Sequence, residues 1–245
     1  MNFYQILFDK PEEALGSCIA IMGGGGKTVL LNTLGNELYL FHDRVLLTSL
    51  TKSAYHSEQK VIFSKSIASG NLSELFSQYN PLHLMHAMIH PEKISGISEE
   101  KLFDYYKQSS LTIFECDGAR NLPLKAHNDT DPTVPSFSTH VIILVGTDVL
   151  NTTVTEGKVH RPELFKSLWG VDDERILDIE FVTKVVTTKK GYLSKIPEHI
   201  RRIYFVNKAD TSNENARKLA LSIYRRTGCS TFYGSIHKGF WRPAQ

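Results

Sequence analysis

The sequence predicts an α/β fold in which a mainly parallel sheet carries helices on both faces. Apolar runs of strand length alternate with segments of helical period, a pattern typical of parallel strands joined by crossover helices. The first such run, residues 19–22, leads into four consecutive glycines followed by Lys27 and Thr28. The 245 residues contain no internal repeat and no low-complexity linker, so we expect one domain spanning 1–245.

The predicted elements follow in order from the hydrophobic pattern. After the glycines, Val29, Leu30, Leu34 and Leu38 recur at helical spacing, and the apolar run 44–48 is typical of a buried strand. Ser98 is the expected N-cap of a helix over 98–107, because acidic residues fill the turn that follows it. We further expect helices over 66–78, 161–169, 178–188 and 213–227, and strands over 82–88, 111–117, 139–145, 202–206 and 229–233.

The composition is that of an ordinary soluble globular protein. Apolar residues make up 41% and charged residues 22%, and a net charge of +2 gives no basic footprint for nucleic acid. No apolar stretch is long enough to cross a membrane, and acidic residues near the N-terminus do not fit a secretory signal. The three cysteines lie far apart, which argues against a disulfide framework or a zinc site. We therefore expect a cytoplasmic protein.

The segment Gly23-Gly24-Gly25-Gly26-Lys27-Thr28 is predicted to bind phosphate. Glycines allow a tight turn in which successive N–H groups point inward at a helix N-terminus, which makes an anion site. Lys27 would reach the terminal phosphates, and Thr28 would place its hydroxyl on Mg²⁺. A flexible linker is the alternative, but it would not need a lysine and a hydroxyl in register with a helix. The pattern G-x-x-x-x-G-K-[ST] requires glycine at position 21, where this chain has isoleucine, and this difference indicates a loop of altered shape.

Two acidic residues end the strand predicted over 111–117. Ligands of open α/β sheets bind beyond the carboxyl ends of the strands, so Glu115 and Asp117 are expected near the phosphate loop. A carboxylate in this place can bind Mg²⁺; Asp117 is the first candidate and Glu115 the second. The alternative is that Asp117 only starts a turn with Gly118.

The segment 207–210 resembles the N-K-x-D signature of GTPases and follows a predicted strand. In such a signature the Asp210 carboxylate accepts the N–H groups of guanine, Lys208 covers the base, and Asn207 braces the loop. Adenine would leave that carboxylate unpaired, so the arrangement discriminates between the two bases. The alternative is that Asp210 or Ser212 caps the helix that follows.

Basic residues in the long loops are candidates for contacts with phosphate. Arg120 or Arg161 would supply charge to a phosphoryl-transfer transition state, in addition to Lys27. Lys125 and His127 would contact phosphate or a second anionic ligand. Solvated loop charge is the alternative for each of them.

Taken together, these segments resemble the YqeC family. The resemblance rests on the glycine loop and on residues 48–52, 115–120, 123–127, 159–162 and 207–210, and it covers nearly the whole chain. Ser49 and Leu50 interrupt a run that is usually threonine in the family, while Cys116 and Ala119 replace its usual alanine and serine.

The resemblance implies a P-loop NTPase-like three-layer sandwich and an accessory role in the maturation of selenium-dependent molybdenum hydroxylases. The cofactors would be Mg²⁺ and GTP or ATP, with slow hydrolysis, and the partner would be a molybdenum hydroxylase apoenzyme or its cofactor. The alternative is a non-hydrolysing carrier or chaperone of a pterin dinucleotide cofactor, with Lys125, His127 and Arg161 as anion contacts. A small-molecule kinase is a third class, but the sequence shows no clear acceptor site or lid.

Overall fold

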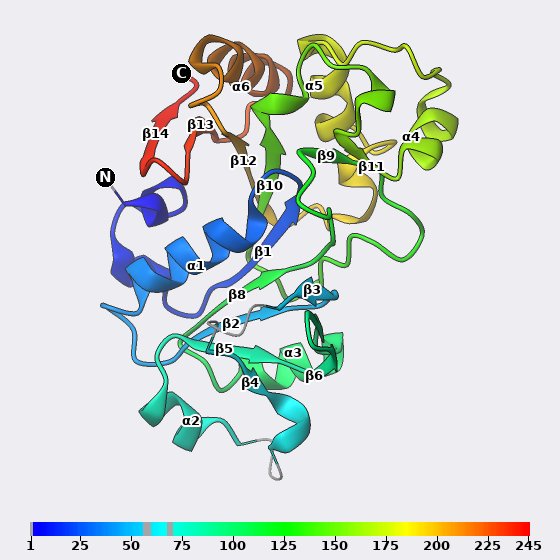
Figure 1. Cartoon of the computed structure of the whole chain (residues 1–245). Helices are drawn as coiled ribbons and strands as arrows, with labels where there is room; N and C mark the ends of the chain where they lie inside the picture. Colours follow the sequence, from blue (N-terminus) through cyan, green and yellow to red (C-terminus); the bar gives the residue numbers. More distant parts are fainter. Residues whose placement is uncertain (1, 56–59, 68–70) are drawn as a thin grey trace.

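The chain is built around a nine-stranded sheet, shown in Figure 1 as a computed structural model that describes residues 2–55, 60–67 and 71–245. The strand order is β14-β13-β12-β10-β1-β8-β2-β5-β4, and only the pairing of β13 with β14 is antiparallel. Two smaller sheets, β11-β9 and β3-β7-β6, accompany it. None of the helices in the described ranges is long and apolar enough to cross a bilayer.

The strands are β1 (Cys18–Gly23), β2 (Val45–Ser49), β3 (Ser53–Ala54), β4 (Ile62–Phe63), β5 (Leu82–Met85), β6 (Ala87–His90), β7 (Lys93–Ser95), β8 (Leu111–Glu115), β9 (Leu124–Lys125), β10 (His140–Gly146), β11 (Val159–His160), β12 (Arg201–Asn207), β13 (Thr231–Ser235) and β14 (Phe240–Pro243). The helices are α1 (Lys27–Leu38), α2 (Ser73–Gln78), α3 (Glu99–Tyr106), α4 (Pro162–Trp169), α5 (Ile179–Thr187) and α6 (Asn213–Thr227).

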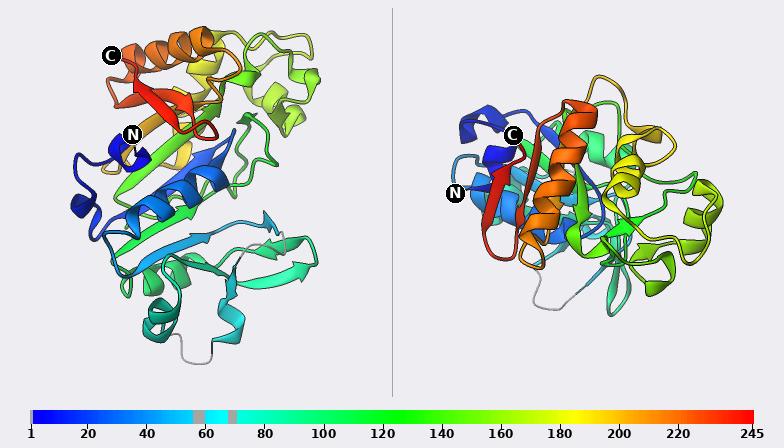
Figure 2. Two further views of the ribbon diagram at one scale, coloured as in Figure 1. Left: turned by 60° about the vertical axis from the view of Figure 1, so that its left-hand side comes forward. Right: turned by 90° about the horizontal axis from the view of Figure 1, so that it is seen from above.

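Helices cover both faces of the large sheet. On one face, α1 and the N-terminal segment around Phe3 pack in a core that includes Ile19 and Ile21 of β1. On the other face, Ala20 and Met22 of the same strand belong to a second core, to which α3, α5 and α6 contribute. Successive side chains of a strand point to opposite faces, so one apolar strand supplies both cores. The predicted α/β fold class is therefore confirmed, and Figure 2 shows the same arrangement from two further sides.

Most predicted elements are present within a few residues of their expected ends. Ser98 is the N-cap of α3 as predicted, because its side chain accepts a hydrogen bond from Lys101 N. The helix predicted over 66–78 is wrong in extent: α2 begins at Ser73, a 3₁₀ turn ends at Ser66, and residues 68–70 lie outside the described residues.

The strand predicted over 82–88 is wrong as one element. β5 ends at Met85, and after His86 the chain turns into the separate sheet of β6 and β7. His86 N donates to Ser95 O, while His86 O accepts from Lys65 N, so the backbone of this residue joins two neighbouring segments. The antiparallel edge strand β14 and the two-residue strands β9 and β11 were not predicted, because such short pairings leave no periodic signal.

Candidate functional site

The glycine segment joins the end of β1 to the start of α1 by a short loop. Ile21 is an interior residue of β1, paired with Ile142 on one side and Glu115 on the other, and the strand continues to Gly23. Only residues 24–26 lie between strand and helix. The backbone of Gly25 and Gly26 has φ of 86° and 123°, which side chains rarely tolerate. The isoleucine at position 21 thus marks a longer strand and a shorter loop.

The backbone amides of this loop divide into two groups. Gly23 N faces both carboxylate oxygens of Asp117 at 3.1 and 3.0 Å, and Gly24 N and Gly25 N donate to neighbouring carbonyls at 3.0 Å. The expectation that all four glycine amides point into the anion site is therefore wrong for these three. Within the described residues, the amides of 26–29 donate to no protein acceptor, and they form the start of the 12-residue helix α1. Such unpartnered amides at a helix N-terminus attract anions.

Close packing explains the glycine at position 24. A Cβ atom there would press on the carbonyl oxygen of Leu122 and lie 2.7 Å from the carbonyl carbon of Pro123. We expect Gly24→Ala to lower the free energy of unfolding by about 1–3 kcal/mol, measured by urea denaturation. Gly118→Ala is the matched control, because a Cβ there meets nothing within 4 Å, and its effect should stay within about 0.5 kcal/mol. Equal losses in both variants would contradict the packing argument.

Asp117 lies beneath the loop and is fully buried. Besides the amide of Gly23, its carboxylate lies 3.3 Å from Nζ of both Lys27 and Lys125, and it accepts a 2.7 Å hydrogen bond from Nε2 of His127. Burial alone would raise the pKa of Asp117, but Lys27, His127 and Lys125 hold it well below its ordinary value. Both carboxylate oxygens of Asp117 therefore have protein partners, and through Gly23 N and Lys27 the carboxylate fixes the position of the glycine loop.

His127 binds Asp117 as a neutral imidazole. Burial lowers the pKa of His127 more than the hydrogen bond to Asp117 raises it. Since Nε2 faces a carboxylate, we assign the proton to Nε2, and Nδ1 has no partner in the described part of the chain. The ring of Tyr192 packs edge-on against the imidazole at 4.6 Å and keeps it in place.

Oppositely charged side chains continue from Asp117 toward the surface. Nζ of the fully buried Lys125 lies 2.6 Å from a carboxylate oxygen of Asp131, which in turn lies 2.8 Å from Arg161. Lys125 and His127 are thus used inside the protein rather than presented to a second anion. The Arg161 side chain is 30% exposed at the outer end of this ion chain, and Arg120 is exposed on the loop after β8.

Lys27 stands at the start of α1 and closes over its own loop. Its Nζ donates to Gly23 O at 2.8 Å and lies 3.3 Å from Asp117. Burial would lower the pKa of Lys27, but the charges of Asp117 and Glu115 raise it above its ordinary value. The side chain is therefore a permanently charged ammonium group. Since an ammonium has three donors, one remains for a phosphate oxygen.

Thr28 contacts Glu115 rather than Asp117. Thr28 Oγ1 donates to Oε1 of Glu115 at 2.6 Å, while Oε2 has no hydrogen bond among the described residues. Burial raises the pKa of Glu115, against the opposing effects of Lys27 and of the Thr28 hydrogen bond. A hydroxyl beside a carboxylate is the hard oxygen chemistry that Mg²⁺ prefers, so these two residues fit that ion. Of the two acids, Glu115 is the one adjacent to Thr28.

Segment 207–210 lies against the glycine loop. The Asn207 side chain donates to Gly25 O at 2.6 Å and accepts from Ile236 N at 3.0 Å, so it joins two loops. Lys208 has φ of 62°, and its Nζ lies 2.7 Å from Oδ2 of Asp148. Asp210 is exposed, and a hydrogen bond with Ser235 lowers its pKa.

Residues 19–163, which include the glycine loop, both acids and Arg161, match the profile of the family described as "YqeC protein". This chain belongs to the YqeC family. The family resemblance predicted from the sequence motifs is therefore confirmed. The chain is 27% identical over 207 residues to "Uncharacterized protein YqeC" of Escherichia coli (strain K12), an alignment that covers 83% of this chain and 80% of that protein. A solved structure of hydrogenase maturation factor HypB from Archaeoglobus fulgidus aligns with 94% of this chain and 89% of its own, with 10% identity and a TM-score of 0.41.

Three residues that lie beside the candidate site of this YqeC protein were not predicted from the sequence: Asp148, Ser235 and His83, which shares a pocket with Thr28 and Glu115. Asp148 follows the end of β10, and Ser235 is the last residue of β13. Inspection of the end of every strand would therefore have found both. His83 lies inside β5, where no spacing or flanking glycine distinguishes it from a packed core residue.

Proposed function

We propose that this YqeC protein binds a nucleoside triphosphate with Mg²⁺ at the carboxyl edge of its sheet and hydrolyses it slowly. The single observation that carries the proposal is the unpartnered first turn of α1, with the charged Lys27 at its start. Free N–H groups and an ammonium group at one helix end are what a polyphosphate requires.

The residues divide into those that contact phosphate and those that support them. The backbone of 26–29 and Nζ of Lys27 would bind the phosphates, and Thr28 and Glu115 would hold Mg²⁺, which screens their negative charge. Asp117 would orient Lys27 and the loop instead of binding the metal directly. Of the two candidate arginines, Arg120 would supply positive charge to the transition state, because its side chain is exposed whereas Arg161 is paired with Asp131.

Guanine is the base that segment 207–210 would select. We expect Asp210→Ala to weaken GTP binding by about tenfold and to leave ATP binding nearly unchanged, because only guanine offers two N–H groups to this carboxylate. Competition binding with GTP and ATP in the presence of Mg²⁺ measures the ratio. Asp172→Ala, at an exposed site, is the control. A GTP-to-ATP ratio that stays the same in the Asp210 variant would refute guanine recognition.

The cellular role is proposed from the family resemblance. We infer an accessory factor in the maturation of selenium-dependent molybdenum hydroxylases, whose partner is the apoenzyme or its cofactor. Activation of a purified apo-hydroxylase with this protein and GTP, compared with GDP, tests the role. Multiple-turnover phosphate release with and without Mg²⁺ tests hydrolysis, and steady turnover would count against a pure carrier of a pterin dinucleotide.

A further inference from the structure

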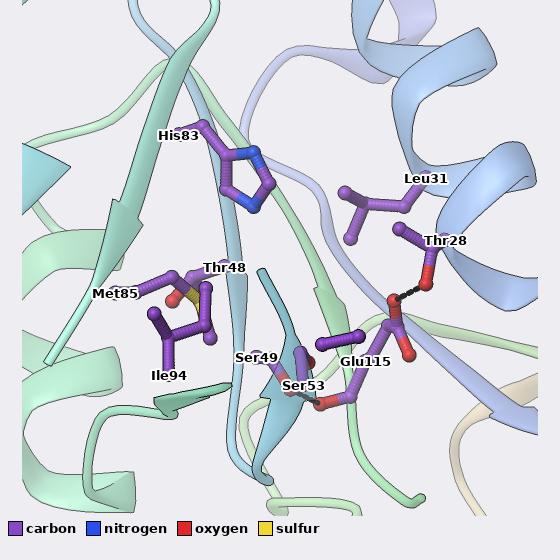
Figure 3. Close-up of a pocket in the computed structure, with 10 residues that line it drawn as sticks. Thr28, Leu31, Thr48, Ser49, Ser53, His83, Met85, Ile94 and Glu115 are labelled. Atoms are coloured by element: carbon purple, nitrogen blue, oxygen red, sulfur yellow. Dashed lines mark hydrogen bonds between the residues drawn. The ribbon is translucent and has the colours of Figure 1, made fainter. Parts of the chain in front are cut away.

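A pocket beside Thr28 and Glu115 contains a histidine, His83, that has no hydrogen-bond partner among the described residues. The pocket lies between α1 and the strands β2 and β5, and Ser53 of β3 and Ile94 of β7 close its outer side (Figure 3). His83 enters it from β5, where it pairs in register with Leu47 of β2. Its imidazole points into the space between the strands and the start of α1.

Some of the polar groups around this pocket have hydrogen-bond partners within the described residues, and others do not. The Thr48 hydroxyl donates to Leu84 O at 2.6 Å, and the Ser49 hydroxyl donates to Thr51 O at 3.1 Å. By contrast, within the described ranges His83 and Oε2 of Glu115 have no hydrogen bond. Burial lowers the pKa of His83 to about 4, so at neutral pH one ring nitrogen is a free acceptor. The ring is only partly covered, so a water molecule in the pocket can reach this nitrogen and donate to it.

The size of the pocket restricts what that donor can be. Its free volume is about 20 Å³, which is the room that one water molecule needs. Leu31, Met85 and Ile94 form apolar walls, so a larger polar donor would not fit and would have few polar partners there. A single water between His83 and the proposed magnesium site satisfies both the space and the free acceptors.

We propose that this pocket holds the water that attacks the terminal phosphate, and that His83 accepts its proton. The inference rests on the proposed function and adds the nucleophile and its base. The water oxygen bonds to the terminal phosphorus as the bond from that phosphorus to the bridging oxygen breaks. The electron pair leaves with the nucleoside diphosphate, and the proton passes to the imidazole and then to solvent. The products are nucleoside diphosphate and orthophosphate.

The test separates the chemical step from nucleotide binding. We expect His83→Ala and His83→Asn to lower kcat for GTP by about 100-fold, with the Kd of a non-hydrolysable GTP analogue unchanged within about twofold. Added imidazole should restore part of the turnover of His83→Ala. His90→Ala, at an exposed position of β6, is the matched control and should behave as the wild type. Unchanged turnover in both His83 variants overturns the inference.

A second measurement does not depend on turnover. Aluminium fluoride with GDP and Mg²⁺ mimics the transferring phosphoryl group and its attacking water, so wild-type protein should bind GDP more tightly in its presence. His83→Ala should lose at least about tenfold of that gain and keep its affinity for GDP alone. If the gain is the same in both proteins, His83 does not contact the nucleophile. If wild-type protein binds neither GTP nor ATP, or binds them without turnover, the proposed function itself fails. If wild-type protein hydrolyses GTP and both His83 variants hydrolyse it as fast, only the role of His83 is overturned.

Discussion

Replacing Lys27 with alanine is expected to lower the affinity for Mg²⁺·GTP by about 100-fold or more. A charge-assisted hydrogen bond from the ammonium group to phosphate contributes about 1.5–3 kcal/mol, and roughly 1.4 kcal/mol corresponds to a tenfold change in Kd. The loss is larger than one bond, because Asp117 lies 3.3 Å from Nζ and its charge would then be compensated less well beside the phosphates. Isothermal titration calorimetry measures the change directly.

The fold should survive this substitution. Without Lys27, the Asp117 carboxylate keeps Gly23 N, His127 and Lys125 as partners. Lys52→Ala removes an equal charge from an exposed position after β2 and is the control, with GTP affinity expected to stay within about twofold. If Lys27→Ala binds GTP as the wild type does, the phosphate-loop assignment is wrong.

Replacing Asp117 with alanine is expected to lower the free energy of unfolding by about 3–5 kcal/mol. The substitution removes the shared partner of Lys27 and Lys125 and leaves the donors Gly23 N and His127 Nε2 without an acceptor. Urea denaturation at pH 7 measures the effect. Glu198→Gln is the control, because the pair of Glu198 with Lys189 is exposed and should contribute little to stability. Similar losses in both variants would show that the buried cluster does not hold the fold.

The contribution of Asp117 should also depend on pH. The pKa of Asp117 in the folded protein lies below its ordinary value of 3.8. Above about pH 4 the carboxylate is therefore ionised in both the folded and the unfolded state, and its full contribution to the free energy of unfolding is present. As the pH falls below that value, the unfolded chain binds the proton first, and the stabilisation is lost. We therefore expect the difference in unfolding free energy between wild type and Asp117→Asn to shrink from pH 6 to pH 3. A difference that stays constant over this range would contradict the depressed pKa.

The sheet and its helices were predictable because they depend on local periodicity. The apolar runs and the helical spacing after Lys27 are readable within a few residues, and β1, β8, β10 and α1 lie where these patterns indicate. The separation of β5 from β6 was not predictable, because the turn at His86 depends on hydrogen bonds to Lys65 and Ser95 from other segments.

The candidate site was only partly predictable. The glycine loop, Thr28 and segment 207–210 stand out as motifs, and the structure places Asn207 directly on Gly25. From the sequence, Asp117 was ranked before Glu115 as the Mg²⁺ ligand, because two acids two residues apart at the end of one predicted strand look alike there. Glu115 ends β8 and faces Thr28, whereas Asp117 lies beyond the strand and turns under Gly23.

By itself, the sequence determined the class of fold, the order of its main elements and the position of the glycine loop between the first strand and its helix. Only the tertiary structure decided which amides of that loop remain free, which acid faces Thr28, and that Lys125 and His127 lie inside. The physical reason is that these choices are made by contacts between distant segments. Gly23 and Asp117 lie 94 positions apart, and their contact depends on strand register and on the balance of buried charges. Neither the strand register nor the balance of buried charges can be inferred from a local sequence pattern.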